Sequence, residues 1–229
     1  MRLATSVRTS LGIACSVAVM SSQAATMTLT DWEFGSGSSV NVSAPIYNGA
    51  AGGFKGTLTG AGPGFDTNSL YTYCVQLTQS FNWGTPYAVN VTLASDYFAN
   101  NPVFGAGSGV GNAKAALLGK LFSYVEADPT RVDTSAESTA LQLAVWNIVY
   151  DTDLTLGSGA FHDSSSYAVA ASGFLSAANS YAGPLTQAVY VLDGAAQDQL
   201  IWRRVPEPMS VSLVAVALFG LSFTRRRRA

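Results

Sequence analysis

The last twenty-five residues constrain this 229-residue chain more than any other stretch. They begin with Val205-Pro206-Glu207-Pro208, continue as an uncharged apolar run at 209–224 and end in four arginines at 225–228. Prolines cannot continue a helix or donate to a sheet, so the start is predicted to be extended. Sixteen helical residues span about 24 Å, which is short for a bilayer, but the arginine stems can reach the interface. Because positive charge stays on the cytoplasmic side, the tail predicts a tethered protein whose body lies outside.

The tail resembles the PEP-CTERM sorting signal of Gram-negative bacteria in all three of its parts. These are the triplet Pro206, Glu207 and Pro208, the short apolar helix at 209–224 and the basic cluster at 225–228. The resemblance implies recognition by an exosortase in the membrane, with processing near the triplet. It also implies a place beside extracellular polysaccharide, as in a biofilm. An ordinary single-pass transmembrane anchor is the alternative.

The other end of the chain has the features of a secretory signal peptide. Arg2 and Arg8 form a basic region, an apolar stretch follows at 11–20, and Ser22-Gln23-Ala24 is a small-x-small cleavage pattern. A lipoprotein site at Cys15 is a weaker reading, because the residues before it make a poor lipobox. We therefore predict three segments: a signal peptide at 1–24, an exported domain at 25–204 and the sorting tail at 205–229.

The exported domain is acidic once both ends are set aside. The chain has 12 Lys and Arg and 14 Asp and Glu, and six of the basic and one of the acidic residues lie in the ends. Residues 25–204 therefore carry a net charge of −7, which makes nucleic acid an unsuitable partner. A length of 180 residues fits one domain with a sizeable core.

The order of hydrophobic patterns predicts an α+β domain. Alternating apolar and polar residues from 27 to about 92 predict strands, with Asn48-Gly49 as a turn, and the Gly-rich segment 100–112 predicts a long loop. Helical spacing follows at 113–126, at 134–150 and at 165–181, and strand-like segments close the domain at 187–192 and 199–202. The helix at 134–150 opens with the capping box Thr134-Ser135-Ala136-Glu137. We expect an antiparallel sheet or sandwich with about three helices packed on it.

Cysteine usage singles out one residue. Cys15 leaves with the signal peptide, so the exported domain keeps Cys74 alone and forms no internal disulfide. An unpaired cysteine in an oxidising compartment is a liability unless it is buried, paired between chains or chemically used.

Two local motifs point to a use for this cysteine. Tyr73-Cys74 lies in an apolar strand, and Gln142 is a polar residue in the otherwise apolar Leu141-Gln142-Leu143-Ala144-Val145-Trp146. By its spacing Gln142 shares an inward face with Val145, Trp146 and Val149, so its carboxamide needs a partner. The two motifs resemble those of the thioester domains of bacterial surface adhesins, in which a cysteine after an aromatic residue is crosslinked to a glutamine in a Thr-Gln-x-Ala pattern that usually precedes an aliphatic residue and Trp. Leu141 stands where that family has threonine.

The resemblance implies an internal thioester between Cys74 and Gln142, with Tyr73, Ala144 and Trp146 supporting the site. A thiolate at Cys74 would attack the Gln142 carboxamide and expel ammonia, and an amine or hydroxyl of a partner would later attack the same carbonyl. Formation requires the two side chains to be held near attack geometry, with donors for the developing oxyanion that the sequence does not name. The alternative is that Cys74 is a buried core residue and that Gln142 bonds to backbone.

Other constellations are weaker. His162, the one histidine, could pair with Cys74 in a hydrolase, but it lies in a loop-like segment. Asp151 and Asp153 could bind calcium, yet this pattern more often caps a helix and a turn. Trp32, Trp83 and Trp202 could form a sugar-stacking face, although aromatic residues in strands usually belong to the core.

The sequence therefore predicts an exported adhesion or matrix protein with no catalytic turnover, no cofactor and no metal. It would be anchored in the inner membrane before processing by the exosortase and reach the cell surface or matrix afterwards. Its partners would be the exosortase, the membrane and a nucleophile on extracellular polysaccharide or a surface protein. The alternative function is a non-covalent structural or glycan-binding matrix protein.

Overall fold

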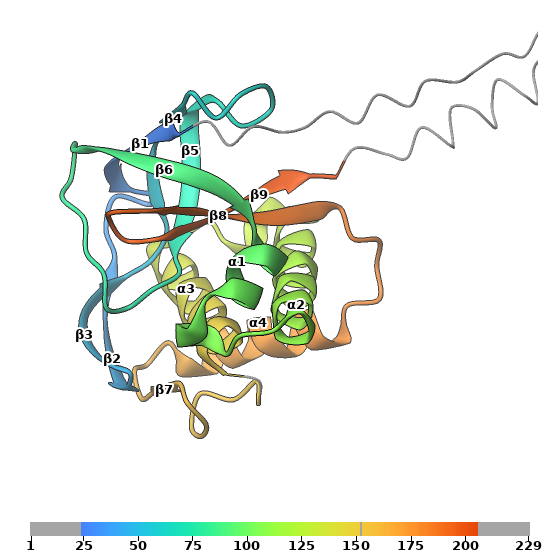
Figure 1. Cartoon of the computed structure of the whole chain (residues 1–229). Helices are drawn as coiled ribbons and strands as arrows, with labels where there is room; N and C mark the ends of the chain where they lie inside the picture. The colour runs from blue at the N-terminus through green and yellow to red at the C-terminus, as the bar shows by residue number, and fades with distance from the viewer. Residues whose placement is uncertain (1–23, 152, 206–229) are drawn as a thin grey trace, which may run out of the picture.

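The computed structural model describes residues 24–151 and 153–205, which form an α+β fold with antiparallel sheets and four α-helices (Figure 1). Six strands close into a barrel, and three others form a small separate sheet. The helices gather at one side of the barrel (Figure 1). The predicted class is thus confirmed. The expected antiparallel sheet is present as a closed barrel with a small second sheet, and there is one α-helix more than the three expected.

The barrel is an antiparallel ring in the order β1-β4-β5-β9-β8-β6. Pairing of β1 with β6 closes it, with Thr26 opposite Ala88. Along β1, Ala25, Met27 and Leu29 are buried while their neighbours are more exposed, as expected when one strand face meets a core. The six strands are β1 (Ala25–Trp32), β4 (Phe54–Thr59), β5 (Thr67–Cys74), β6 (Pro86–Leu93), β8 (Gln187–Gly194) and β9 (Gln199–Arg204).

The second sheet has the order β3-β2-β7, from β2 (Ser38–Ala44), β3 (Ile46–Ala51) and β7 (His162–Asp163). Asn48-Gly49 was predicted to be a turn and instead lies inside β3. The glycine is needed for a different reason. The Tyr47 ring folds over it to donate a hydrogen bond to the Ala50 carbonyl, and a Cβ at Gly49 would lie 2.8 Å from the Tyr47 hydroxyl.

The helices are α1 (Ala94–Asn100), α2 (Ser108–Glu126), α3 (Ser135–Tyr150) and α4 (Ala168–Ser180). Two short 3₁₀ turns lie between them, η1 (Pro102–Phe104) and η2 (Pro129–Arg131). Helix α1 was not predicted, and α2 begins inside the Gly-rich segment that was predicted to be a loop. Gly111 explains the error, because a Cβ there would lie 2.2 Å from the Ser95 carbonyl oxygen. The glycine lets α1 and α2 approach closely rather than ending a helix.

Helix α3 is the most enclosed helix of the fold. All residues from Ser138 to Val149 are buried, between α2 and α4 on one side and β5 with the small sheet on the other. Its predicted capping box is present: the Thr134 hydroxyl accepts from the Glu137 amide, and the Glu137 carboxylate accepts from the Thr134 amide. The cap and the apolar surroundings fix this helix against the end of β5.

No helix among residues 24–151 and 153–205 is long and apolar enough to cross a membrane. The predicted signal peptide, except for Ala24, and the sorting tail from Pro206 onward lie outside the described residues.

Candidate functional site

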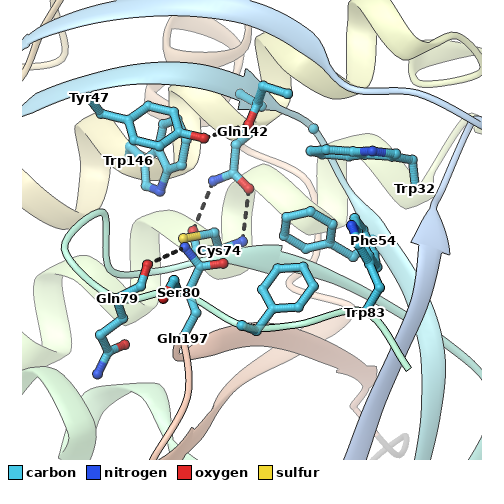
Figure 2. A pocket seen from close by; sticks show the side chains of 14 residues that line it. Trp32, Tyr47, Phe54, Cys74, Gln79, Ser80, Trp83, Gln142, Trp146 and Gln197 are labelled. Carbon is cyan, nitrogen blue, oxygen red and sulfur yellow. Dashed lines mark hydrogen bonds between the residues drawn. The ribbon is translucent and has the colours of Figure 1, made fainter. Parts of the chain in front are cut away.

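The side chain of Gln142 is bound directly to the backbone of Cys74 (Figure 2). The Cys74 amide donates to Gln142 Oε1 at 2.8 Å, and Gln142 Nε2 donates to the Cys74 carbonyl, also at 2.8 Å. Both residues are buried. The carboxamide is thus bound to the backbone amide and carbonyl of Cys74 itself. The sulfur of Cys74 is only two covalent bonds from the Cα between these two groups, so the thiol lies close to the carboxamide.

The Gln142 carboxamide occupies the hydrogen-bonding position beside β5 that β4 does not reach. Strand β4 pairs with β5 only as far as Phe54 opposite Thr72, so the next residues of β5 lack a strand on that side. On the other side, β9 continues to pair with Tyr73 and Cys74. One N–H of a primary carboxamide lies beside its C=O, so the group can bond to the vacant amide and carbonyl of a single strand residue, here Cys74.

Glycine makes room for the helix at this point. The Gly53 amide donates to Ser138 Oγ at 2.8 Å, so α3 approaches the chain just before β4. A Cβ at Gly53 would lie 2.2 Å from a carboxylate oxygen of Glu33 and 3.1 Å from Ser138 Oγ. The small residue therefore lets α3, rather than β4, contact the end of β5.

One face of α3 runs along the end of β5 and the residues after it, and contacts them in sequence order. Its members, four residues apart, are Ser138, Gln142, Trp146 and Tyr150. Ser138 Oγ lies 3.2 Å from the Tyr73 hydroxyl, Gln142 holds Cys74, and the Tyr150 hydroxyl accepts from the Leu77 amide at 2.9 Å. Residues four apart lie on one helix face, so this spacing aligns the helix with the strand. Trp146, as predicted, lies on the same face as Gln142.

The thiol of Cys74 is held in a neutral, apolar environment. Burial raises its pKa far above the ordinary value, and the nearby indole of Trp146 opposes this effect only in part. The thiol also makes a long contact of 3.4 Å with the Gln76 carbonyl. At neutral pH the free side chain is therefore a thiol and not a thiolate.

A pocket of about 270 Å³ opens on this pair (Figure 2). Tyr47 and Trp146 lie on one side of Cys74 and Gln142, and a group of rings that includes Trp32, Phe54 and Trp83 lies on the other side. Within that group Trp83 contacts Trp32, Phe54 and Phe81 edge to face, with centroids 4.8–5.7 Å apart. The remaining lining comes from Ala50, Ala51, Gly52, Gln79, Ser80 and Gln197.

A second buried cluster adjoins the first on the opposite side of β5. The Tyr73 hydroxyl donates to Glu33 at 3.0 Å, and the Ser138 hydroxyl contacts the same carboxylate oxygen at 3.4 Å. Burial raises the pKa of Glu33, although both hydroxyls oppose the shift. Tyr73 therefore does not line the pocket; it fixes α3 against β5 one residue before Cys74.

The structure places the other predicted support residues differently. Trp146 lines the pocket, 2% exposed, and its indole N–H has no hydrogen-bond partner among the described residues. Ala144 is fully buried in α3 and does not line the pocket, so it only fills space in the core. Leu141, which replaces the threonine of the thioester pattern, faces the smaller pocket beside Tyr73 and Glu33.

The weaker candidates lie elsewhere. His162 is in β7, opposite Ala44 of β2, and does not line the pocket of Cys74. The Asp151 carboxylate accepts from the Phe161 amide, and Asp153 accepts from Thr155, so both organise their loop. The described residues contain no group of three or more His, Cys, Asp or Glu side chains arranged to hold a metal ion.

The three tryptophans of the expected sugar-stacking face, Trp32, Trp83 and Trp202, lie in two separate places. Trp32 and Trp83 meet at the pocket, as a sugar-stacking face would require. Trp202 stacks on Phe122 at 4.2 Å and donates to Glu126, away from the pocket.

Sequence reasoning missed several residues of the site. Tyr47, Phe54, Phe81, Ser80 and Gln197 line the pocket, and Ser138 positions the helix. Ser138 could have been found by extending the four-residue stripe back from Gln142. The pocket residues come from distant loops and strands, and no local pattern marks them.

Comparisons with protein-family models, with curated proteins and with solved structures give no match for this chain.

Proposed function

We propose that this is an exported surface or matrix protein that attaches covalently to a partner through a thioester between Cys74 and Gln142. The observation that carries the proposal is the pair of 2.8 Å hydrogen bonds between the Gln142 carboxamide and the backbone of Cys74. These bonds keep the reacting carbon beside the reacting sulfur, which is the costly part of bringing two groups to attack distance.

Formation of the thioester exchanges one bond for another at the carbon of the carboxamide. The sulfur of Cys74 bonds to Gln142 Cδ, the Cδ–Nε2 bond breaks, and the thiol proton leaves with the nitrogen as ammonia. Because burial keeps the thiol protonated, the proton passes to the departing nitrogen during the step and not to bulk water. No cofactor enters this balance.

The backbone of Cys74 supplies the polar groups that the step needs. Its amide donates to Gln142 Oε1 at 2.8 Å, which is within the range of an oxyanion-hole donor, so it favours the negative charge that develops on that oxygen. Its carbonyl accepts from Nε2 and so orients the leaving group. The residue that attacks thus also orients and activates its target.

Attachment to a partner follows by attack of a nucleophile on the thioester carbon. The new bond joins the partner to Gln142, and the sulfur leaves and takes up the nucleophile's proton. Cys74 is then a free thiol and the carboxamide nitrogen is gone, so each molecule reacts once. The protein is on this proposal an adhesive and not an enzyme with turnover.

The proposed setting comes from the two ends of the sequence. A signal peptide at 1–24 and a sorting tail at 205–229 would export the domain, hold it at the inner membrane and present it to an exosortase. Residues 25–204 would then face the cell surface or matrix, where polysaccharide and protein nucleophiles are available.

A non-covalent matrix or glycan-binding role is the second candidate. Both the oxygen and the nitrogen of the Gln142 carboxamide are hydrogen-bonded to the Cys74 backbone, which is also what a purely structural glutamine would show. In that case Cys74 remains a buried thiol, and the aromatic pocket alone carries the function.

The intact mass of the purified protein separates the two candidates. We expect the wild type to be lighter than its computed mass by one ammonia, and methylamine to restore the loss by adding to Gln142. A Cys74→Ala variant is the control and should have its computed mass with or without methylamine. A wild-type mass equal to the computed value, with one titratable thiol, rejects the thioester.

A further inference from the structure

We infer that the partner's reacting group is a hydroxyl of an uncharged sugar bound in the aromatic pocket beside Cys74 and Gln142. This inference rests on the proposed thioester and deepens it, because it names the chemical class that the thioester captures. It is drawn from the shape and chemistry of the pocket, where a ligand must lie to reach the thioester carbon.

The lining of the pocket is uncharged. None of its 14 residues is an aspartate, glutamate, lysine, arginine or histidine. A charged ligand entering such a site would lose its hydration without gaining an ion pair, which is unfavourable. This argues against phosphate, carboxylate and ammonium groups as the bound part of the partner.

The pocket walls suit a flat ligand ring that has apolar faces and polar groups at its edge. Trp83 is 45% exposed, and with Trp32 it gives the pocket a wall of open indole surface. Tyr47 and Trp146 lie on the other side of the reacting pair (Figure 2). A sugar ring presents its C–H groups to such surfaces and its hydroxyls at its edge, and a volume of about 270 Å³ is near the small end of ligand pockets.

The polar groups at the pocket suit hydroxyls. The Trp146 indole N–H is shielded from solvent and makes no hydrogen bond within normal distance to the described residues, but it lies near the Cys74 thiol, whose pKa it lowers, so it acts on the reacting pair itself. The Ser80 hydroxyl lines the pocket, and so does Gln197, whose carboxamide is already hydrogen-bonded to the carbonyls of Gln76 and Gln79 and to Gln199. The Ser80 hydroxyl, set among neutral amide and indole groups, suits a ligand that exchanges neutral rather than charged hydrogen bonds.

A lysine side chain is the competing nucleophile and fits less well. Aromatic rings do attract an ammonium group, but the attracted form is protonated and has no lone pair for attack. Lysine is protonated at neutral pH, and the lining holds no carboxylate or imidazole to take its proton. A sugar hydroxyl is neutral when it binds. The hydroxyl proton goes to the departing sulfur of Cys74. Burial raises the pKa of this thiol, so the sulfur accepts the proton readily.

The balance of the capture step is simple. The sugar oxygen bonds to Gln142 Cδ, the bond from Cδ to the sulfur of Cys74 breaks, and the hydroxyl proton ends on that sulfur. The product is an ester between the sugar and Gln142, whereas a lysine would give an amide. Hydroxylamine cleaves esters and leaves amides intact, so the two products are distinguishable.

The experiment uses purified protein that carries the ammonia mass deficit. It is incubated separately with the methyl glycosides of common neutral hexoses and with Nα-acetyl-lysine methylamide, and loss of the thioester is followed by intact mass. We expect a hexose adduct that hydroxylamine removes, formed faster than the lysine adduct. Trp83→Ala should slow the hexose reaction about tenfold more than it slows the methylamine reaction, the size of one good aromatic contact.

Matched variants separate the pocket from general effects. Trp83→Phe keeps a ring and should retain most of the hexose rate. Tyr71→Ala removes an exposed aromatic residue of β5 outside the pocket and should change nothing. A faster lysine reaction whose product resists hydroxylamine, or a hexose rate indifferent to Trp83, overturns the inference and leaves the thioester in place. Absence of the mass deficit in the starting protein rejects the proposed function itself, and the inference with it.

Discussion

The hydroxyl of Ser138 lies 3.2 Å from the hydroxyl of Tyr73, one helical turn before Gln142 and one residue before Cys74. Helix and strand are therefore joined twice in succession, first by these hydroxyls and then by the carboxamide and backbone of the reacting pair. The first contact limits how far α3 can slide or rotate along β5. It fixes the position of Gln142, on which the proposed thioester would depend.

Ser138→Ala should reduce the share of molecules that form the thioester. The substitution removes the contact to Tyr73 and the acceptor of the Gly53 amide, at a cost of about 1–3 kcal/mol for the buried group left unpaired. Intact mass would show a mixture with and without the ammonia deficit. Ser172→Ala, which removes an exposed hydroxyl of α4, is the control and should give the wild-type mass. A complete deficit in Ser138→Ala would show that Gln142 needs no help from this contact.

Gln142→Met and Cys74→Ala should both abolish the mass deficit but differ in stability. Both lack the crosslink, yet only Gln142→Met leaves the buried amide and carbonyl of Cys74 without partners. We expect Gln142→Met to be less stable than Cys74→Ala by about 1–3 kcal/mol in denaturant unfolding. Equal stabilities would mean that water or another group replaces the carboxamide.

The free energy of unfolding should contain a pH-dependent part from Glu33. Burial raises the pKa of this carboxyl above its ordinary value of 4.5, so the folded protein binds the proton more tightly than the unfolded chain. The contribution is fully present below pH 4.5 and is lost as the pH rises through the folded pKa. Glu33→Gln should lack this decline, so the stability of the wild type relative to the variant should fall with rising pH. A relative stability that rises with pH would contradict the assigned direction.

Once the thioester has been opened by methylamine, the thiol of Cys74 should react slowly with alkylating agents. Burial raises its pKa and also blocks access, so at neutral pH we expect alkylation at least tenfold slower in the folded protein than in the unfolded chain. Iodoacetamide followed by mass measurement, with and without denaturant, tests this. Equal rates would show that opening the thioester exposes the cysteine.

Thr134→Ala should destabilise the protein by about 1 kcal/mol, because the capping box at the start of α3 loses its hydroxyl. Thr134→Ser keeps the hydroxyl and serves as the control. Denaturant unfolding of the two variants gives the difference directly. If both variants unfold like the wild type, the packing of α3 alone determines where the helix begins.

Local patterns in the sequence are sufficient for α3 and for the six barrel strands, but they do not predict β3 or β7 of the small sheet. The capping-box residues Thr134 and Glu137 predict where the helix begins. Gln142, a polar residue in an apolar run, indicates a buried side chain that needs a hydrogen-bond partner. The pairing of Gln142 with Cys74 was expected from the thioester resemblance, and the structure places the two together.

Features that depend on distant contacts escape such patterns. Closure of the barrel depends on β1 meeting β6, about sixty residues later in the chain, and local alternation is the same in an open sheet. Glycine is typical of loops, but here it has other roles. Gly111 lets α1 and α2 approach closely, and Gly49 leaves room for the Tyr47 ring over β3. The pocket was missed because its lining is assembled from segments between Trp32 and Gln197.

Closure of the barrel also affects how copies of the protein meet one another. A free strand edge is a template for pairing with another chain, so crowded copies of a protein can associate along such edges. Each of the six barrel strands has a neighbour on both sides, so the barrel offers no continuous edge. Among the described residues, β3 is the longest strand with one unpaired side, and it ends the small sheet. Crowded copies are thus protected from aggregation along most of their strands.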